Sequence, residues 1–218
     1  MKLAIYGAGG LGREAKEYAD LQNEQEEKWS EIFFLDDGID EGKFFGTRLV
    51  HWDTFLESDY FDETEVVLTL GDPVSKRKVF ESIKDSGCRF GQIVAPSARV
   101  SKTAKVGSSL VVLEGAIVES LTELGDCVVV DNYATVGHDS VVGSYCHIAA
   151  KSSIGGESVL GEGVFIGLCV STKQCNKIGS YVTVGMGSVV LKDLPDEVVA
   201  VGNPCRILRK RDKDTRSL

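Results

Sequence analysis

The stretch "VVDNYATVGHDSVVGSYCHIAAKSSIGG", Val129–Gly156, carries a branched apolar residue at every sixth position. The same spacing runs from Val94 to Val190, and only Thr172 departs from Val, Leu or Ile. A helix would need an apolar spacing of about 3.6 residues, and an ordinary strand would alternate apolar and polar residues and then stop at a turn. A period of six instead predicts a parallel β-helix, in which one side chain from each short strand fills a narrow interior.

Small residues mark the corners of this repeat. Glycine often follows the apolar position, as at Gly137 and Gly143, and Ala or Ser often lies four residues after it. Glycine permits the positive φ values that corners require and that branched residues resist. Because each unit buries its face only by stacking on the next, residues 93–218 are expected to form one array.

Residues 1–92 predict a separate Rossmann-like α/β module. Strands are expected near residues 2–6, 31–35, 66–70 and 91–94, with a helix from 13 to about 21. The turn Gly7-Ala8-Gly9-Gly10-Leu11-Gly12 has G-x-G-x-x-G spacing between strand and helix, which favours phosphate at a helix N-terminus. The second strand ends in Asp36 and Asp37, where such folds present carboxylates to a ribose or base.

The glycine turn allows three interpretations. A dinucleotide site for NAD is disfavoured, because the module is closer to one mononucleotide half than to two. A sugar nucleotide would need only one half. The turn could also do no more than pack the helix on the strand, since a single glycine motif is weak evidence of binding.

Composition excludes several classes of function. The chain has 218 residues, 43% hydrophobic and 26% charged, with a net charge of -9. The negative charge argues against a nucleic-acid binder, and no apolar run of about 18 residues predicts a membrane span. Six cysteines occur without a CxxC pair or zinc-like spacing, which favours a reducing compartment and a cytoplasmic protein.

The repeat also predicts where His138 points. Val136 and Ser140 should face the interior, so His138, midway between them, should face outward. Imidazole suits proton removal at neutral pH, and Asp139 could fix its tautomer. The alternative is an exposed loop histidine without a role. His51, beside Trp52 after an expected edge strand, is interpreted as structural.

The repeat and the ending "VVAVGNPCRIL", Val198–Leu208, resemble the hexapeptide acyltransferases and their G-N-P-A-[KR] exit. With the preceding module, the chain resembles bacterial sialic acid O-acetyltransferase and the nucleotide-linked 4-amino-sugar N-acetyltransferases. The resemblance implies a left-handed β-helix in which three hexapeptides make one triangular coil. It also implies a homotrimer with sites between subunits, acetyl-CoA as acyl donor and no metal.

The resemblance implies a role for individual residues. The nucleotide sugar would contact the residues that match the family's nucleotide motif, with Asp72 and Asp131 where the family often has Asn and Leu11 where it often has His. The matching positions are Gly7, Gly9, Gly12, Asp36, Asp37, Gly71, Asp72 and Asp131. His138 would be the general base, oriented by Asp139.

The acyl donor would contact His147, the backbone N–H of Gly156 and Arg206. Arg206 belongs to a basic cluster with Arg209, Lys210 and Arg211, which could attract the coenzyme's phosphates or form a solvated tail. His147 lies half a coil from His138, so a neighbouring chain would have to supply one of the two histidines to a common site.

Three functions therefore stay open at this stage. The first is N-acetylation of a nucleotide-linked amino sugar. The second is O-acetylation of a sugar such as sialic acid, with the N-terminal module as a structural cap. The third is a non-catalytic β-helix that binds a ligand or scaffolds an assembly, which His138 beside Asp139 disfavours.

Overall fold

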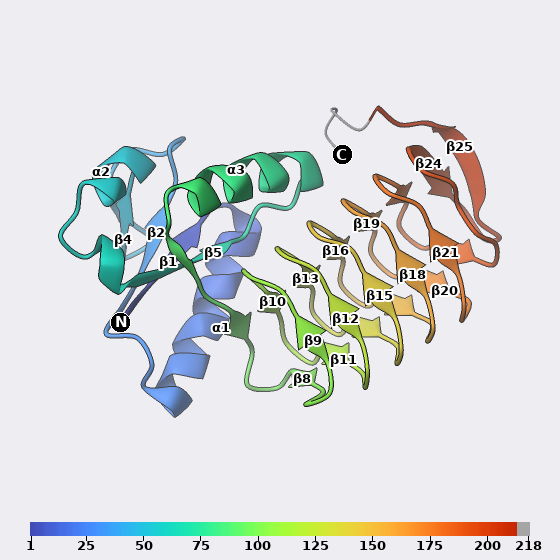
Figure 1. The fold of residues 1–218 in the computed structure, drawn as a ribbon, viewed down its shortest axis with the longest axis horizontal. Helices are drawn as coiled ribbons and strands as arrows, with labels where there is room; N and C mark the ends of the chain where they lie inside the picture. Colours follow the sequence, from blue (N-terminus) through green and yellow to red (C-terminus); the bar gives the residue numbers. More distant parts are fainter. Residues whose placement is uncertain (213–218) are drawn as a thin grey trace.

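A computed structural model describes residues 1–212 and shows an α/β module followed by a long prism of stacked coils (Figure 1). The predicted fold, a Rossmann-like module and then a left-handed β-helix, is confirmed. Residues 213–218, which the prediction included in the second domain, lie outside the described residues.

The module is built around a six-stranded sheet with the order β3-β4-β2-β1-β5-β6. Its elements are β1 (Lys2–Tyr6), α1 (Gly10–Glu26), β2 (Glu31–Leu35), β3 (Gly42–Phe44), β4 (Thr47–Val50), α2 (Trp52–Leu56), the 3-10 turn η1 (Phe61–Glu63), β5 (Thr64–Leu68), α3 (Pro73–Asp85) and β6 (Arg89–Phe90). Every neighbouring pair is parallel except the β3–β4 hairpin. This hairpin was not predicted, and it makes β4 an inner strand rather than an edge.

The prism consists of short parallel strands in three sheets, one for each face. The strands are β7 (Ile93–Val94), β8 (Arg99–Val100), β9 (Lys105–Val106), β10 (Val111–Val112), β11 (Ile117–Val118), β12 (Glu123–Leu124), β13 (Val129–Val130), β14 (Thr135–Val136), β15 (Val141–Val142), β16 (His147–Ile148), β17 (Ser153–Ile154), β18 (Val159–Leu160), β19 (Phe165–Ile166), β20 (Ser171–Thr172), β21 (Lys177–Ile178), β22 (Thr183–Val184) and β23 (Val189–Val190). Two longer strands, β24 (Val198–Val201) and β25 (Arg206–Lys210), close the far end.

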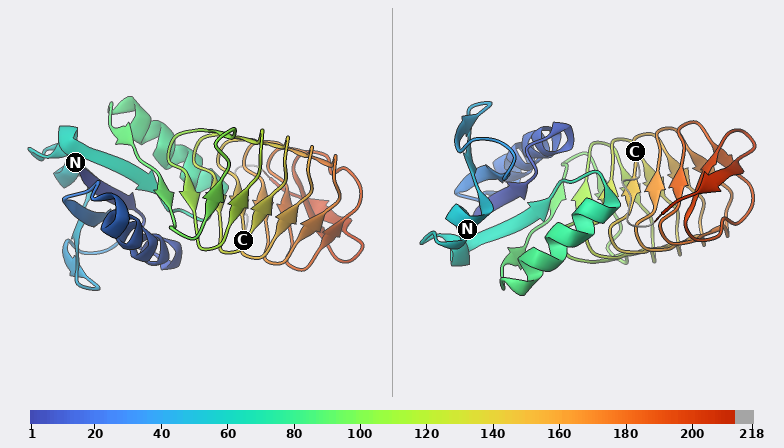
Figure 2. Two further views of the ribbon diagram at one scale, coloured as in Figure 1. Left: turned by 90° about the horizontal axis from the view of Figure 1, so that it is seen from below. Right: turned by 90° about the horizontal axis from the view of Figure 1, so that it is seen from above.

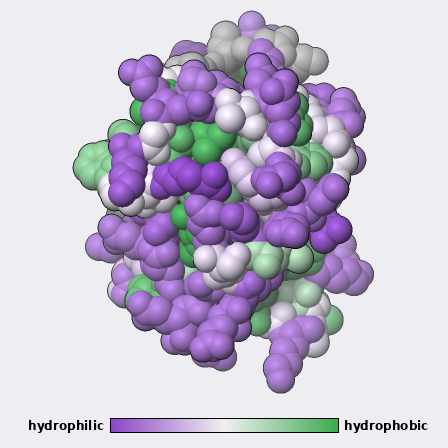
Figure 3. All heavy atoms as spheres, turned by 90° about the vertical axis from the view of Figure 1, so that its left-hand side faces the viewer, coloured by the Kyte–Doolittle hydropathy of each residue, from purple (hydrophilic) through white to green (hydrophobic). Residues whose placement is uncertain are grey.

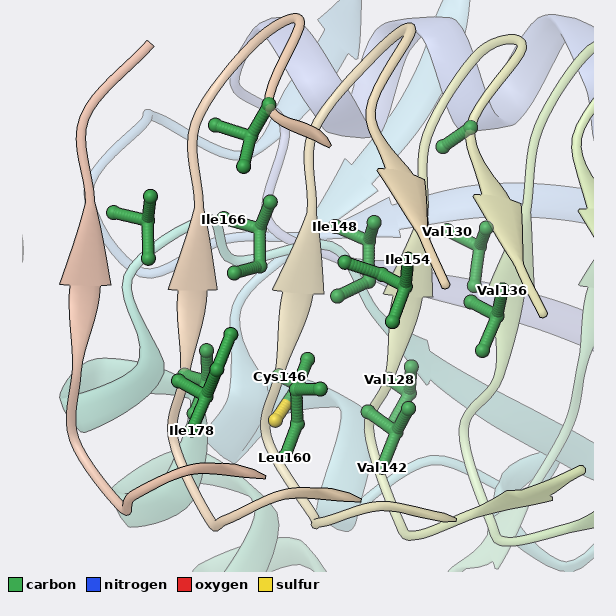
Figure 4. Packing of buried hydrophobic residues seen from close by; sticks show 14 of the residues in the cluster. Val128, Val130, Val136, Val142, Cys146, Ile148, Ile154, Leu160, Ile166 and Ile178 are labelled. Atoms are coloured by element: carbon green, nitrogen blue, oxygen red, sulfur yellow. The ribbon is translucent and has the colours of Figure 1, made fainter. Parts of the chain in front are cut away.

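The interior of the prism is filled by the sixth-position side chains. Figure 4 shows Val130, Val136 and Ile148 pointing into the same narrow space. Each is fully buried. The second residue of each two-residue strand therefore builds the core, while the first residue faces outward on the pleat.

One face of the prism, which we call the covered face, carries β7, β10, β13 and β16 and packs against the module. Val111 and Val129 on this face share a hydrophobic cluster with Leu3 and Ile5 of β1. The views in Figure 2 show α3 lying alongside the coils. The two domains therefore pack through a shared apolar cluster, which is distinct from the interior of the prism.

The remaining outer surface of the module is mainly polar. Figure 3 looks at the end of the molecule that the module forms, where hydrophilic residues predominate and hydrophobic ones appear as small patches. The other two faces of the prism are separate sheets that include no strand of the module. One consists of β8, β11, β14, β17, β20 and β23, and the other of β9, β12, β15, β18 and β21.

Candidate active site

His138 lies at a corner of the prism, just after β14. Its side chain is 52% exposed, and its Nδ1 is 2.8 Å from Oδ2 of Asp139. Asp139 adopts a left-handed φ of 55°, a conformation that Asp tolerates better than most residues. The corner thus directs the imidazole outward, and among residues 1–212 no hydrogen bond occupies Nε2, which can exchange a proton.

The coils on either side fix the position of this imidazole. The backbone N–H of His138 donates to Oε2 of Glu119 at 2.9 Å, and its carbonyl accepts from the N–H of Glu157 at 2.8 Å. The ring lies against Gly156: a Cβ added there would stand 2.7 Å from Nε2. Only glycine at position 156 therefore leaves the ring where it is.

The surroundings of His138 are acidic. The hydrogen bond that Nδ1 of His138 donates to Asp139 raises the pKa of His138 above its ordinary value, and the charges of Asp139, Glu119 and Glu157 add to this effect. A base with a raised pKa accepts a proton more readily but is ionised over more of the acidic range.

A groove of about 590 Å³ opens beside His138 on the side of the first coils. Its lining consists of Arg99, Val100, Ser101, Lys102, Ile117, Val118, Glu119, Ser120 and His138. The groove and Gly156 thus flank the imidazole from opposite directions along the prism.

His147 is placed quite differently, on β16 of the covered face. It is 7% exposed and packs against Phe165, with ring centroids 5.3 Å apart. Its Nε2 lies 3.6 Å from Oδ2 of Asp131. Burial lowers the pKa of His147, and Asp131 opposes that shift only in part. The backbone of Gly71 also approaches this ring.

Asp131 is held by the same junction. Burial alone would raise the pKa of its carboxyl, but interactions with His147 and with the backbone N–H of Asn132 outweigh burial and lower it. Asp131 and Gly71 therefore meet His147 within one chain, whereas His138 lies at a corner after β14, a strand of another face.

The glycine turn of the module has one tight side and one open side. Gly7 has a φ of +104°, and a Cβ at Gly12 would stand 1.8 Å from the carbonyl oxygen of Gly7. A Cβ at Gly9 would meet no atom within 4 Å. Gly7 and Gly12 allow the helix to pack closely on the strand, and Gly9 leaves room for a ligand.

The two aspartates after β2 brace the module from within. Asp36 accepts from the N–H of Ala8 at 2.8 Å and from that of Gly38 at 2.9 Å. Asp37 accepts from the hydroxyl of Tyr6 at 2.6 Å and from the N–H of Trp52 at 2.7 Å. A ligand would therefore meet carboxylates that are already oriented.

The loop after β5 has a structural role as well. Asp72 caps α3 by accepting from the N–H of Ser75 at 2.9 Å, while Gly71 faces open space. Capping typically stabilises a helix by about 1 kcal/mol. Nε2 of His51 donates to the carbonyl of Ile39 at 2.8 Å, which fits the interpretation of His51 as structural.

The basic cluster at the C-terminus is divided. Arg206 and Lys210 are exposed on β25, which pairs with β24 and so is an ordered strand rather than a solvated tail. Arg211, by contrast, is 3% exposed and donates through Nη1 to the carbonyl of Tyr181 at 3.0 Å. Its expected place in a phosphate-attracting cluster is therefore wrong.

Two residues near these sites were missed by the sequence analysis. Glu119 could have been found, because stacking Val118 against Val136 brings residue 119 beside the backbone that leads to His138. Lys76 on α3 is fully buried, with Nζ 3.2 Å from the carbonyl of Cys146. Nothing in the local sequence marks it, since its burial depends on how α3 docks.

No cluster of three or more His, Cys, Asp or Glu side chains within residues 1–212 could hold a metal ion. No helix in this part of the chain has the length and hydrophobicity needed to cross a membrane.

Comparisons with known sequences match parts of the chain. The PglD N-terminal domain family matches residues 2–83. An acyl-[acyl-carrier-protein]–UDP-N-acetylglucosamine O-acyltransferase of Pseudomonas aeruginosa is 31% identical over 83 residues, 38% of this chain and 32% of that protein. Serine acetyltransferase 2 of Arabidopsis thaliana is 29% identical over 131 residues, which are 59% of this chain and 36% of that protein. The match thus spans about a third of the length of these curated relatives.

Solved structures match nearly the whole chain. The acetyltransferase domain of PglB from Neisseria gonorrhoeae, in complex with acetyl coenzyme A, has a TM-score of 0.89 and 31% identity, covering 95% of this chain and 98% of that one. PerB from Caulobacter crescentus, in complex with CoA and GDP-perosamine, has a TM-score of 0.86 and 26% identity, covering 95% and 97%. WeeI from Acinetobacter baumannii has a TM-score of 0.86 and 25% identity, covering 95% and 100%.

Proposed function

The chain belongs to the hexapeptide-repeat acetyltransferases of nucleotide-linked amino sugars, and on this premise we propose that it transfers an acetyl group from acetyl-CoA to the amino group of a nucleotide-linked sugar. The observation that carries the proposal is the pair His138–Asp139, exposed at a corner of the prism with Nδ1 held and Nε2 free. The acetyl-CoA and GDP-perosamine complexes of the similar structures support the same two substrates.

The geometry supports a direct transfer. The neutral amine attacks the thioester carbonyl, a C–N bond forms, and Nε2 of His138 takes the proton that the amine loses. The C–S bond then breaks, and the protonated imidazole returns this proton to the departing thiolate. Asp139 stabilises the imidazolium and fixes the tautomer throughout.

Gly156 would stabilise the charge on the carbonyl oxygen. Among residues 1–212 its backbone N–H has no hydrogen-bond acceptor. A donor preorganised at a developing oxyanion lowers the barrier by a few kcal/mol, typically about 3. The coenzyme would extend over the later coils, with its phosphates near Arg206 and Lys210.

We place the nucleotide at the open side of the glycine turn, near Gly9 and Gly71. His147 and Asp131 face that loop, whereas His138 is on another part of the surface, so one chain alone does not assemble the site. We therefore propose a homotrimer in which His138 of one subunit meets His147 of its neighbour. The free cysteines suit a reducing compartment such as the cytoplasm.

Subunit complementation tests the shared site. His138→Ala and His147→Ala chains would each be inactive as homo-oligomers, but co-expressed chains would form mixed trimers in which one interface has both histidines. Acetyl transfer should reappear in the mixed sample, while light scattering shows a trimer. If the mixed trimers stayed as inactive as the single variants, the shared site would be wrong.

A ligand panel tests the substrate. UDP-, GDP- and dTDP-linked amino sugars would be added separately in a thermal melt, because a ligand at 100 times its dissociation constant adds about 2.7 kcal/mol of stability. One nucleotide should stabilise the protein, and NAD should not. The curated O-acyltransferases among the relatives make a hydroxyl acceptor the second candidate, and acetylation only of the corresponding hydroxyl sugars would favour it.

A further inference from the structure

Glu119 is the one carboxylate that lines the groove beside His138. It stands directly after β11, and the pairing of Val118 with Val136 carries it to the backbone of the histidine corner. Its Oε2 accepts the His138 N–H at 2.9 Å, which occupies one carboxylate oxygen. The other oxygen has no hydrogen-bond or ion-pair partner among residues 1–212.

The rest of the groove does not neutralise this charge. Arg99 and Lys102 line its far part, one coil earlier, and neither forms an ion pair within the described chain. Successive coils stack at the strand spacing of about 4.8 Å. The groove therefore orders its charges along the prism: two cations, then Glu119, then the imidazole.

This order suits an acceptor with a positive group near the base. The amino group of a sugar, with a pKa near or above that of an α-amine at about 8, is largely protonated at neutral pH. A hydroxyl acceptor carries no such charge. A carboxylate in the groove that the imidazole also lines therefore distinguishes the two acceptors by charge, whereas His138 itself could deprotonate either one.

We propose that Glu119 binds the ammonium form of the acceptor's amino group and so sets the preference of the groove for an amine over a hydroxyl. This inference rests on the proposed function and deepens it. The bound ammonium releases one proton to water, and the neutral amine that results gives its second proton to His138 as it attacks. Glu119 acts on the bound ground state, so its effect falls mainly on KM and Kd.

The test uses the full-length protein and the amino-sugar nucleotide that the thermal panel selects, together with its hydroxyl counterpart. Glu119→Gln keeps an oxygen for the His138 N–H but removes the charge. Loss of a charge-assisted hydrogen bond to the ammonium group predicts a Kd for the amino sugar at least about tenfold weaker by calorimetry. The change for the hydroxyl counterpart should be much smaller.

Glu157→Gln is the matched control. Glu157 is also a carboxylate beside His138, but it does not line the groove. Its neutralisation should weaken the binding of both acceptors equally, and by less than Glu119→Gln weakens the binding of the amino sugar. Equal losses from the two Glu variants, or equal losses for both acceptors in Glu119→Gln, would overturn the assignment.

A third variant separates folding from recognition. Glu119→Asp keeps the charge on a shorter arm and should recover part of the amine preference, with melting temperatures recorded for all variants. If the wild-type protein acetylates no amino sugar at all, the proposed function fails. If the wild type acetylates amino sugars but Glu119→Gln keeps the same preference, only the role of Glu119 fails.

Discussion

The corner around His138 and the junction around His147 are built by different forces. His138 is 52% exposed and is positioned almost wholly by the repeat, through Glu119 one coil before it and Gly156 one coil after it. His147 is 7% exposed and is positioned by the docking of the module on the covered face. Changes at the corner should therefore affect chemistry, and changes at the junction should also affect stability.

The largest expected effect is that of His138→Ala. Loss of a general base typically costs about 10² to 10⁴ in kcat. Because the side chain is exposed, the melting temperature should change little, and so should the affinity for acetyl-CoA. Steady-state kinetics and a thermal melt on the same preparation measure both quantities. Full activity in this variant would show that the base lies elsewhere, with His147 the next candidate.

Gly156→Ala sharpens the contrast, because it alters the corner without removing a polar group. The new Cβ would stand 2.7 Å from Nε2 of His138, so the exposed ring would turn away. A displacement of about 1 Å at a reacting group can cost about 10²-fold in rate. The expected result is a large loss of kcat with nearly unchanged stability. A large fall in melting temperature would mean that the ring could not move and that the corner is more rigid than its exposure indicates.

Asp139→Asn should have a smaller effect than His138→Ala. Asp139 raises the pKa of His138, so in the wild type activity is present above that raised pKa and is lost as pH falls through it. The variant should move this acidic limb to lower pH while lowering the plateau, because an amide orients the ring less well. A pH profile of kcat/KM measures both effects.

The double variant tests whether the two residues act as a unit. His138→Ala with Asp139→Asn should be no slower than His138→Ala alone, since Asp139 acts only through the ring. A loss equal to the product of the two single losses would show independent roles.

The sequence predicted the corner because the repeat fixes it. Once Val136 and Ser140 face inward, the direction of His138 follows from the pleat. The fold class was equally accessible, since the six-residue period is incompatible with a helix. The bounds of the module's elements were less so: α1 extends from Gly10 to Glu26, beyond the expected 13–21. The strand expected in the module near residues 91–94 is wrong, because the module sheet ends at β6 (Arg89–Phe90) and Ile93–Val94 forms the first strand of the prism.

The junction could not be predicted, because it depends on contacts between distant segments. His147 stands in the same repeat register as other outward residues, and only the docking of the module buries it. For the same reason the sequence places Arg211 in a basic cluster, although its side chain is buried beside Tyr181. Lys76, on a helix with several exposed basic residues, is buried by the same docking.

The smallest expected effect concerns that lysine and tests the junction by stability alone. Lys76 is fully buried, and burial lowers its pKa to about 8 from an ordinary value of 10.5. Below pH 8 the amine is protonated in both the folded and the unfolded chain, so the cost of the buried charge is present in full. Between pH 8 and 10.5 the unfolded chain binds more protons, so the free energy of unfolding should rise with pH in that window.

Lys76→Met removes the charge and keeps the length of the side chain. The carbonyl of Cys146, which accepts from Nζ, also accepts from the N–H of Val129 at 3.0 Å and so stays partnered. Replacing a buried charge by an apolar side chain can stabilise a protein, here by about 1–2 kcal/mol at pH 7. Urea unfolding should show this gain and the loss of the rise above pH 8. Lys78→Met, an exposed position on the same helix, should change stability by less than about 0.5 kcal/mol. If Lys76→Met were instead destabilising while Lys78→Met was neutral, the bond from Nζ to Cys146 would outweigh the cost of burial, and the junction would depend on this polar contact more than on its apolar packing.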